Sequence, residues 1–128
     1  MEITGYNKSQ LNEFITSVEF MSMDAIPISL HRALSHIHNP YASENDTLLF
    51  IARENEKMIA YAGVLADEIT IDGKTEKCGW FSLFWVDPGY RGKGIGKQMM
   101  EQAIASWNDK ILVADYVPAT KVIYDITR

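Results

Sequence analysis

The chain has 128 residues, 47% of them hydrophobic, and a formal net charge of −5. This size suits one hydrophobic core, so we expect a single domain over residues 1–128. The acidic balance argues against a nucleic-acid partner, and no apolar run reaches the about 18 residues that a membrane span needs. A single cysteine, Cys78, and an N-terminus without a basic start or an apolar region predict a cytoplasmic protein.

Two helices are predicted after a short strand at residues 2–6. Ser9 and Ser29 are their expected N-caps, because a serine hydroxyl accepts a hydrogen bond from an N–H group of the first turn. The dipeptide Asn39-Pro40 ends the second helix. Apolar residues recur at helical spacing in both helices, namely Leu11, Phe14, Ile15 and Val18 in the first and Leu30, Ala33, Leu34 and Ile37 in the second.

The rest of the chain alternates between strands and helices. Two strands joined by a polar turn come first, and the hairpin turn Asp72-Gly73 leads into an apolar strand that ends at Val86. The order β-α-α-β-β-β-α-β-α predicts an α/β protein in the broad sense, with both helices and strands. Because its sheet is expected to be mixed, the fold is of the α+β type. The expected ranges are strands at 47–52, 58–65 and 111–117, a helix that stops near 108–109, and a last helical segment at 119–128. The helix that stops near 108–109 is expected to carry an apolar stripe, formed by Ile95, Met99, Met100, Ala103, Ile104 and Trp107.

The segment from Val86 to Lys97 carries the clearest functional signal. It connects a predicted strand to a predicted helix, so its glycines are expected at a helix N-terminus, where unpaired N–H groups and the helix dipole attract anions. Basic side chains add positive charge at the same place. This loop is therefore predicted to bind phosphate. Its glycine and basic residues are Gly89, Arg91, Gly92, Lys93, Gly94, Gly96 and Lys97.

Two common types of phosphate-binding loop do not match this segment fully. A Walker A loop needs a longer spacing than that between Gly92 and Gly96, and Gln98 stands where the loop needs a hydroxyl residue. A dinucleotide-binding fingerprint needs glycine at the position of Lys97, although Asp115 lies about where a ribose-binding acid would. Dinucleotide binding therefore stays open as an alternative.

The pattern Arg91-x-x-Gly94-x-Gly96, preceded by Val86-x-Pro88, resembles the R/Q-x-x-G-x-G/A signature of the GNAT acetyltransferase superfamily. In that family the loop holds the pyrophosphate of acetyl-CoA, and the predicted element order also matches the GNAT fold. The resemblance implies an acetyl-CoA-dependent N-acetyltransferase that acts on an amine of a small molecule or protein. The cofactor-binding residues that it implies are Phe84, Trp85, Val86, Arg91, Gly92, Lys93, Gly94, Ile95, Gly96 and Lys97.

The resemblance also implies roles in acyl transfer. The family has a bulge on its fourth strand whose N–H groups bind the acetyl carbonyl and the pantetheine, here at residues 83–86, with the main chain of Phe84 and Val86 as the best candidates. Tyr124 resembles the family's tyrosine that protonates the thiolate of coenzyme A. A phenol suits this transfer because its ordinary pKa, about 10, is close to that of an alkyl thiol. Simple packing is the alternative for Tyr124.

No general base is evident from the sequence. Many family members place a glutamate on the fourth strand, and residues 78–86 contain none. A surface position is the favoured interpretation for each of the nearby acids and the role of general base is the alternative, so none is assigned a catalytic role. They are Asp67, Glu68, Glu76 and Asp115.

Three histidines in and beside the second predicted helix raise the hypothesis of a metal site. The spacing of His31, His36 and His38 does not stack them on one helical face, so no metal is expected. In family members this region lines the acceptor pocket, so contact of His31 and Arg32 with substrate is one reading and an ordinary surface position is the other.

The family continues after its fourth helix with two more strands, whereas this chain ends at Arg128. We therefore expect a fragment of a longer polypeptide, with a naturally minimal domain as the alternative. An uncovered sheet edge in such a fragment favours a homo-oligomer. The alternative function is a non-catalytic acyl-CoA-binding or assembly module of a larger protein.

Overall fold

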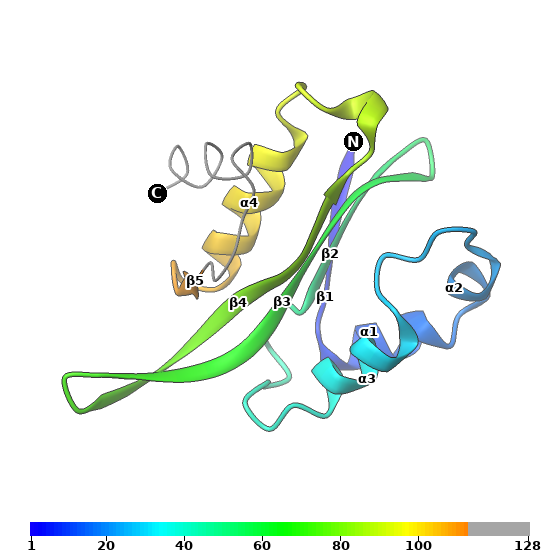
Figure 1. The fold of residues 1–128 in the computed structure, drawn as a ribbon. Coiled ribbons are helices and arrows are strands. Elements are labelled where there is room, and N and C mark those ends of the chain that lie inside the picture. Colours follow the sequence, from blue (N-terminus) through cyan, green and yellow to red (C-terminus); the bar gives the residue numbers. More distant parts are fainter. Residues whose placement is uncertain (113–128) are drawn as a thin grey trace.

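The computed structural model describes residues 1–112 and contains a sheet with strand order β1-β2-β3-β4-β5 (Figure 1). Neighbouring strands from β1 to β4 are antiparallel, and β5 runs parallel to β4. This mixed sheet confirms the predicted fold class. The strands are β1 (Glu2–Tyr6), β2 (Leu49–Glu54), β3 (Lys57–Ile71), β4 (Lys74–Val86) and β5 (Ile111–Leu112).

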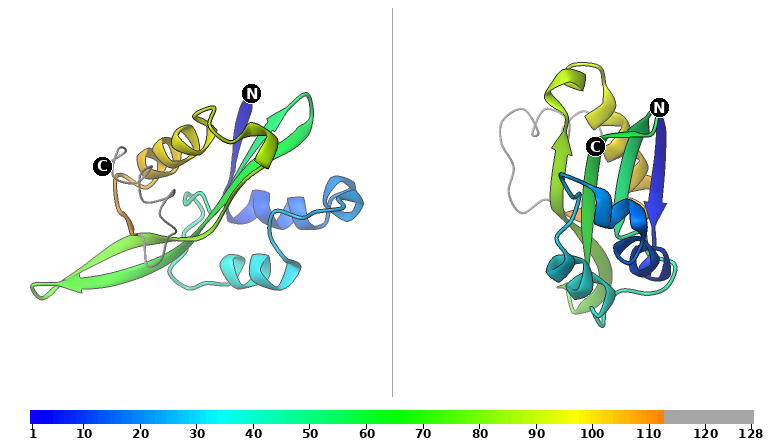
Figure 2. Two further views of the ribbon diagram at one scale, coloured as in Figure 1. Left: turned by 45° about the horizontal axis from the view of Figure 1, so that its top comes forward. Right: turned by 90° about the vertical axis from the view of Figure 1, so that its right-hand side faces the viewer.

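Helices cover both faces of the sheet. Figures 1 and 2 show α1, α2 and α3 on one face and α4 on the other. A short 3-10 helix, η1 (Pro88–Tyr90), lies in the connection from β4 to α4. None of the described helices is long and apolar enough to cross a membrane. The helices are α1 (Lys8–Ile15), α2 (Val18–Ser22), α3 (Leu30–Ile37) and α4 (Ile95–Ser106).

The first predicted helix is two helices in the structure. Asn7, not Ser9, is the N-cap of α1, because its side chain accepts from the Gln10 N–H while the Gln10 side chain accepts from the Asn7 N–H. Ser17 then caps a separate helix, α2. Val18 is therefore not part of the apolar face of α1, and 80% of its surface is exposed.

Ser29 caps α3 as predicted, and the buried face matches the predicted one in part, because Ala33 is buried and Ile37 packs against the core. Leu30 is 51% exposed and Leu34 is 37% exposed, whereas Ala33 and His36 are buried. The helical spacing alone favoured the leucines because they are the most apolar side chains. The hydrogen bond from His36 to the sheet instead sets which side of α3 faces inward.

The strands differ from their predicted ranges mainly in length. β2 begins two residues later than expected, and β3 extends as far as Ile71. The two tight turns are Asn55-Glu56 and Asp72-Gly73, all with positive φ, as two-residue hairpins between twisted strands require. The second hairpin projects beyond the rest of the sheet (Figure 1).

The core lies on both sides of β2 and the central part of β3. Residues 49–52 of β2 are all buried, so this strand is covered on both faces. The apolar stripe predicted for the helix after the glycine loop is buried as α4, through Ile95, Met99, Met100 and Ala103. The sheet thus holds β4 and the start of α4 in fixed relation. The predicted segments beyond residue 112 lie outside the described residues.

Candidate functional site

A β-bulge interrupts the pairing of β3 with β4. Gly63 pairs with Leu83, but Val64 pairs with Phe81, so Ser82 is the extra residue on β4. The bulge is therefore at Ser82, one residue before the predicted range 83–86, because the pairing with β3 shifts between Gly63 and Val64. Gly63 makes room for it, because a Cβ at this position would lie 3.1 Å from Ser82 Oγ.

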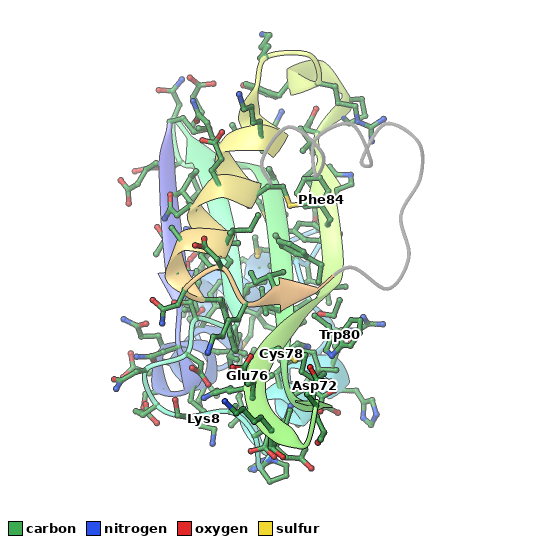
Figure 3. All side chains as sticks on the ribbon, turned by 90° about the vertical axis from the view of Figure 1, so that its left-hand side faces the viewer. Lys8, Asp72, Glu76, Cys78, Trp80 and Phe84 are labelled. Atoms are coloured by element: carbon green, nitrogen blue, oxygen red, sulfur yellow. The ribbon has the colours of Figure 1, made fainter. Side chains whose placement is uncertain are left out.

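Beyond the bulge, β4 presents a free edge within the described residues. β5 pairs with β4 at Gly79 and Trp80, and none of residues 1–112 forms a strand along β4 after that point. Figure 3 shows Cys78, Trp80 and Phe84 in order along the strand, with Phe84 on the part that runs beside α4. We use the term free edge for the side of residues 82–86 that faces away from β3.

The main-chain groups of Phe84 and Val86 face this free edge. The Asp87 N–H donates to the Ile59 carbonyl of β3 at 2.8 Å. Successive residues of an antiparallel strand direct their N–H and C=O groups to alternate sides, so residues 84 and 86 direct theirs away from β3. In agreement, the Val86 carbonyl accepts from Arg91 Nε at 3.0 Å. This is the orientation required of donors to a ligand along β4.

The loop after β4 leads through η1 to a second set of main-chain N–H groups, at the N-terminus of α4. Gly92 and Gly94 have φ values of +81° and +78°, and a Cβ at either position would meet no atom within 4 Å. Gly94 is the N-cap of α4, and no side chain caps the helix. No side chain of the described residues therefore accepts from the first N–H groups of α4, which leaves them as donors for an anion at the helix N-terminus.

Basic side chains surround the loop. Lys93 Nζ lies 5.2 Å from the centre of the Tyr90 ring, and Lys57 Nζ lies 5.7 Å from the same centre. Lys97 Nζ is 3.7 Å from a Glu101 carboxylate oxygen, which offsets part of its charge. Local positive charge is thus concentrated here in a chain whose net charge is −5.

The aromatic residues near the bulge divide into two roles. Phe84 packs against the hydrophobic core. Trp85 stacks on Tyr61 of β3, with ring centres 5.3 Å apart and an angle of 23° between the ring planes. Ile95 and Gly96 are buried in the first turn of α4, so they support the loop by packing and do not present exposed side chains to a ligand.

A buried histidine lies behind the bulge, and sequence reasoning considered it only as a metal ligand. His36 is 2% exposed, with Nδ1 3.1 Å from the Val64 carbonyl oxygen and Nε2 3.4 Å from Ser82 Oγ. Burial lowers the pKa of His36 and the charge of Arg32 lowers it further, while the hydrogen bond to Val64 acts in the opposite direction. Arg32 Nη1 also donates to the Ser82 carbonyl at 3.1 Å.

The carboxylates considered from the sequence do not gather at the bulge. Asp67 accepts from Trp80 Nε1 at 3.0 Å, and Glu68 and Glu76 are exposed on the projecting hairpin. His31 and His38 are exposed, and the described residues contain no group of three His, Cys, Asp or Glu side chains arranged to hold a metal ion. Tyr124 and Asp115 lie outside the described residues.

Comparison with known proteins identifies relatives of this fold. A sequence model of the acetyltransferase (GNAT) family matches residues 15–114. A mutant of a protein from Bacillus halodurans has a TM-score of 0.64 and 17% identity, covering 98% of this chain and 90% of that one. An aminoglycoside N-acetyltransferase in complex with CoA has a TM-score of 0.62 and 15% identity, with 99% and 90% covered.

Glucosamine-6-phosphate N-acetyltransferase from Arabidopsis thaliana has a TM-score of 0.63 and 18% identity, with 98% of this chain and 88% of that one covered. At such identities the likeness shows the fold. The sequence has no significant match among curated proteins. Since the family model spans most of the sequence and the fold agrees with it, the chain belongs to the acetyltransferase (GNAT) family.

Proposed function

We propose that the protein binds acetyl-CoA along the free edge of β4 and the loop before α4, and transfers its acetyl group to an amine. Membership of the acetyltransferase family supports acetyl transfer as the reaction. The observation that carries the proposal is two sets of main-chain donors, those of Phe84 and Val86 on the free edge of β4 and those at the N-terminus of α4.

The residues of the loop fit a diphosphate. The open space above Gly92 and Gly94 lets a phosphate approach the backbone, and the uncapped N–H groups of α4 are donors for its oxygens. Arg91, Lys93 and Lys97 supply the charge. The bond from Arg91 to Val86 holds the loop against the end of β4, so the phosphate site and the strand edge stay in register.

The strand residues would act on the reacting carbonyl. The N–H groups of Phe84 and Val86 are fixed by pairing of β4 with β3, so they can donate to an oxygen that gains negative charge without reorganising. Tyr124 is proposed as the acid that protonates the departing thiolate. The Trp85 ring of β4 and the Tyr61 ring of β3 stack on each other. Together they would form an aromatic wall against the pantetheine or the acceptor.

The experiment combines binding with turnover. Acetyl-CoA should raise the melting temperature of the protein, because a ligand of the folded state stabilises it by about 2.7 kcal/mol at about 100 times its dissociation constant. ATP and NAD serve as controls. Mass spectrometry should then detect acetylated product in a panel of amines that includes aminoglycosides and amino sugars, the acceptor classes in the names of structural neighbours.

The outcomes separate the alternatives. A melting shift without acetylation of any amine would support a non-catalytic acyl-CoA-binding module. A shift with NAD but not acetyl-CoA would support dinucleotide binding. Folded protein that responds to neither acetyl-CoA nor CoA at millimolar concentration would contradict the proposal.

A further inference from the structure

We propose that Ser82 and His36 form a proton relay that takes up the proton released by the acceptor amine during acetyl transfer. The inference rests on the proposed function and adds the proton acceptor that it lacks. Residues 78–86 of β4 contain no carboxylate, and of the acids considered from the sequence the three within the described residues, Asp67, Glu68 and Glu76, do not reach the bulge. Among the described residues, the pair formed by Ser82 and His36 supplies a proton acceptor at this position.

The hydrogen bonds of His36 fix the position of its proton. A backbone carbonyl can only accept, so the contact of 3.1 Å to Val64 requires the proton on Nδ1. In the neutral ring, Nε2 is then a bare acceptor, and it lies 3.4 Å from Ser82 Oγ. The Ser82 hydroxyl therefore donates to Nε2, which leaves the lone pairs of its oxygen for a proton from outside.

The bulge places this hydroxyl where the free edge begins. Ser82 is the extra residue on β4, two positions before Phe84 and two after Trp80, the last residue of β4 that pairs with β5 in the described chain. Its side chain is half-buried, whereas His36 is 2% exposed. An acceptor that attacks a carbonyl held at the edge of β4 can thus reach Ser82, and His36 acts through it.

The groups around the His36 ring keep it neutral before the reaction and favour loss of its proton afterwards. The contacts from the sheet are uncharged, the Val64 carbonyl of β3 and the Ser82 hydroxyl of β4. Arg32, on the same helix, is the charged group that acts on the ring. Burial and this charge both lower the pKa of His36, so the ring is unprotonated at neutral pH and does not retain a proton between turnovers.

The proposed step is balanced in atoms and charge. The lone pair of a free amine attacks the thioester carbonyl carbon, so that a C–N bond forms and the C–S bond breaks. The nitrogen passes a proton to Ser82 Oγ as Ser82 passes its own to His36 Nε2. The sulfur leaves as thiolate and takes a proton from the acid proposed above, Tyr124. The His36 imidazolium then loses its proton to solvent, and Tyr124 regains one.

The first test needs no acceptor. Nitrogen-detected NMR of isotope-labelled protein should show His36 as the neutral ring protonated on Nδ1 at pH 7.5, with its Nε2 resonance shifted in Ser82→Ala. A ring protonated on Nε2, or an imidazolium at this pH, would overturn the relay even if the protein acetylates amines. The relay and the proposed function can therefore fail separately.

The second test measures turnover with an amine from the panel. Ser82→Ala and His36→Gln should each lower kcat by about 10²-fold, and the double variant no further, because the two residues act as a unit. KM for acetyl-CoA should not change. The fall of wild-type kcat on the acid side, as His36 takes a proton, should disappear in Ser82→Ala.

Matched controls lie on the same helix. Ser35→Ala and His38→Gln remove an exposed serine and an exposed histidine of this region and should retain wild-type kcat. If His36→Gln fails to fold, Ser82→Ala decides alone, since its side chain is only half-buried. Wild-type kcat in Ser82→Ala with acetyl transfer as the slow step, or a stable acetyl group on Ser82 after incubation with acetyl-CoA, would overturn the proposal.

Discussion

His36 is a polar side chain buried on α3 beside the predicted apolar positions, and its burial makes folding stability sensitive to pH. Because its pKa in the folded state is lowered from about 6.5, the unfolded chain binds this proton more readily. The contribution of neutral His36 to stability is complete above about pH 6.5 and is lost as the pH falls below that value, with a limiting slope of about 1.4 kcal/mol per pH unit.

This dependence can be measured by urea unfolding of the wild type and His36→Gln between pH 5 and 8. The free energy of unfolding of the wild type should fall more steeply than that of His36→Gln below about pH 6.5, with parallel curves above it. His38→Gln should follow the wild-type slope, because this side chain is exposed. Parallel curves over the whole range for His36→Gln would contradict the lowered pKa.

Gly94 offers a second prediction at the scale of one residue. A branched side chain is strained at its φ of +78° and would project into the open space where a phosphate must approach. Gly94→Val should therefore abolish the melting shift caused by acetyl-CoA. Gly73→Val is the matched control, because Gly73 has the same φ of +78°, also has no atom within 4 Å of a Cβ, and lies at the tip of the projecting hairpin.

Both glycine variants should lose similar stability from backbone strain, on the order of 1–2 kcal/mol. Only Gly94→Val should lose the response to acetyl-CoA, as calorimetric titration of the folded variants would show. An equal loss of binding in Gly73→Val would point to a general effect of destabilisation, and full binding by Gly94→Val would place the phosphates elsewhere.

At the scale of elements, neighbouring residues in the sequence predicted turns, caps and buried helix faces, whereas tertiary contacts determined other features. The turn at Asp72-Gly73, the cap at Ser29 and the buried stripe of α4 depend on neighbouring residues, and all three are confirmed. The break between α1 and α2 was missed because Ser17 interrupts an apolar pattern that continues through Val18.

The candidate site divides in the same way. The glycine loop is contiguous in sequence, so its residue types and spacing predicted a strand, a turn and a helix N-terminus in the right places. The contact between Ser82 and His36 joins residues 46 positions apart, and a bulge has no distinctive residue pattern in so apolar a strand. The contact between Ser82 and His36 could not be predicted from the sequence, because it depends on how α3 packs on the sheet.

The packing of β4 against the end of α4 gives a prediction at this scale. A Cβ at Gly79 would lie 2.4 Å from Val64 Cγ1 and 3.2 Å from the Trp107 ring, so Gly79→Ala must displace packed side chains. Thermal unfolding should show a loss of about 1–3 kcal/mol. Gly63→Ala, whose nearest contacts would be 3.1 Å, should cost less. Equal stability of Gly79→Ala and the wild type would mean that β4 and α4 can separate at this point.

At the scale of the whole molecule, two layers of helices hold a sheet in which residues 49–52 of β2 are buried on both faces, while the candidate functional groups lie at the border of the sheet. β2 and the middle of β3 form the core, and no strand of residues 1–112 covers the free edge of β4. This arrangement lets a rigid interior fix main-chain donors that a ligand can reach. It also places the loop's positive charge on the surface of an acidic protein.

The last prediction concerns which of these charges governs binding of an anionic ligand. The net charge of −5 repels acetyl-CoA as a whole, whereas Arg91, Lys93 and Lys97 attract its phosphates at close range. At physiological ionic strength the Debye length is about 8 Å, so distant acidic residues are screened more than groups in contact with the phosphates. The local attraction should therefore dominate, and the affinity for acetyl-CoA should fall as NaCl is raised from about 0.05 to about 0.5 M.

Calorimetric titration at several salt concentrations would measure this dependence. Lys93→Ala should bind more weakly at low salt and show a shallower salt dependence, because one attractive charge is gone. Lys74→Ala, which removes an exposed lysine at the start of β4 beside the projecting hairpin turn, should match the wild type in slope. An affinity that rises with salt would show that repulsion by the acidic surface outweighs the basic loop, and the phosphates would then have to be held mainly by main-chain N–H groups.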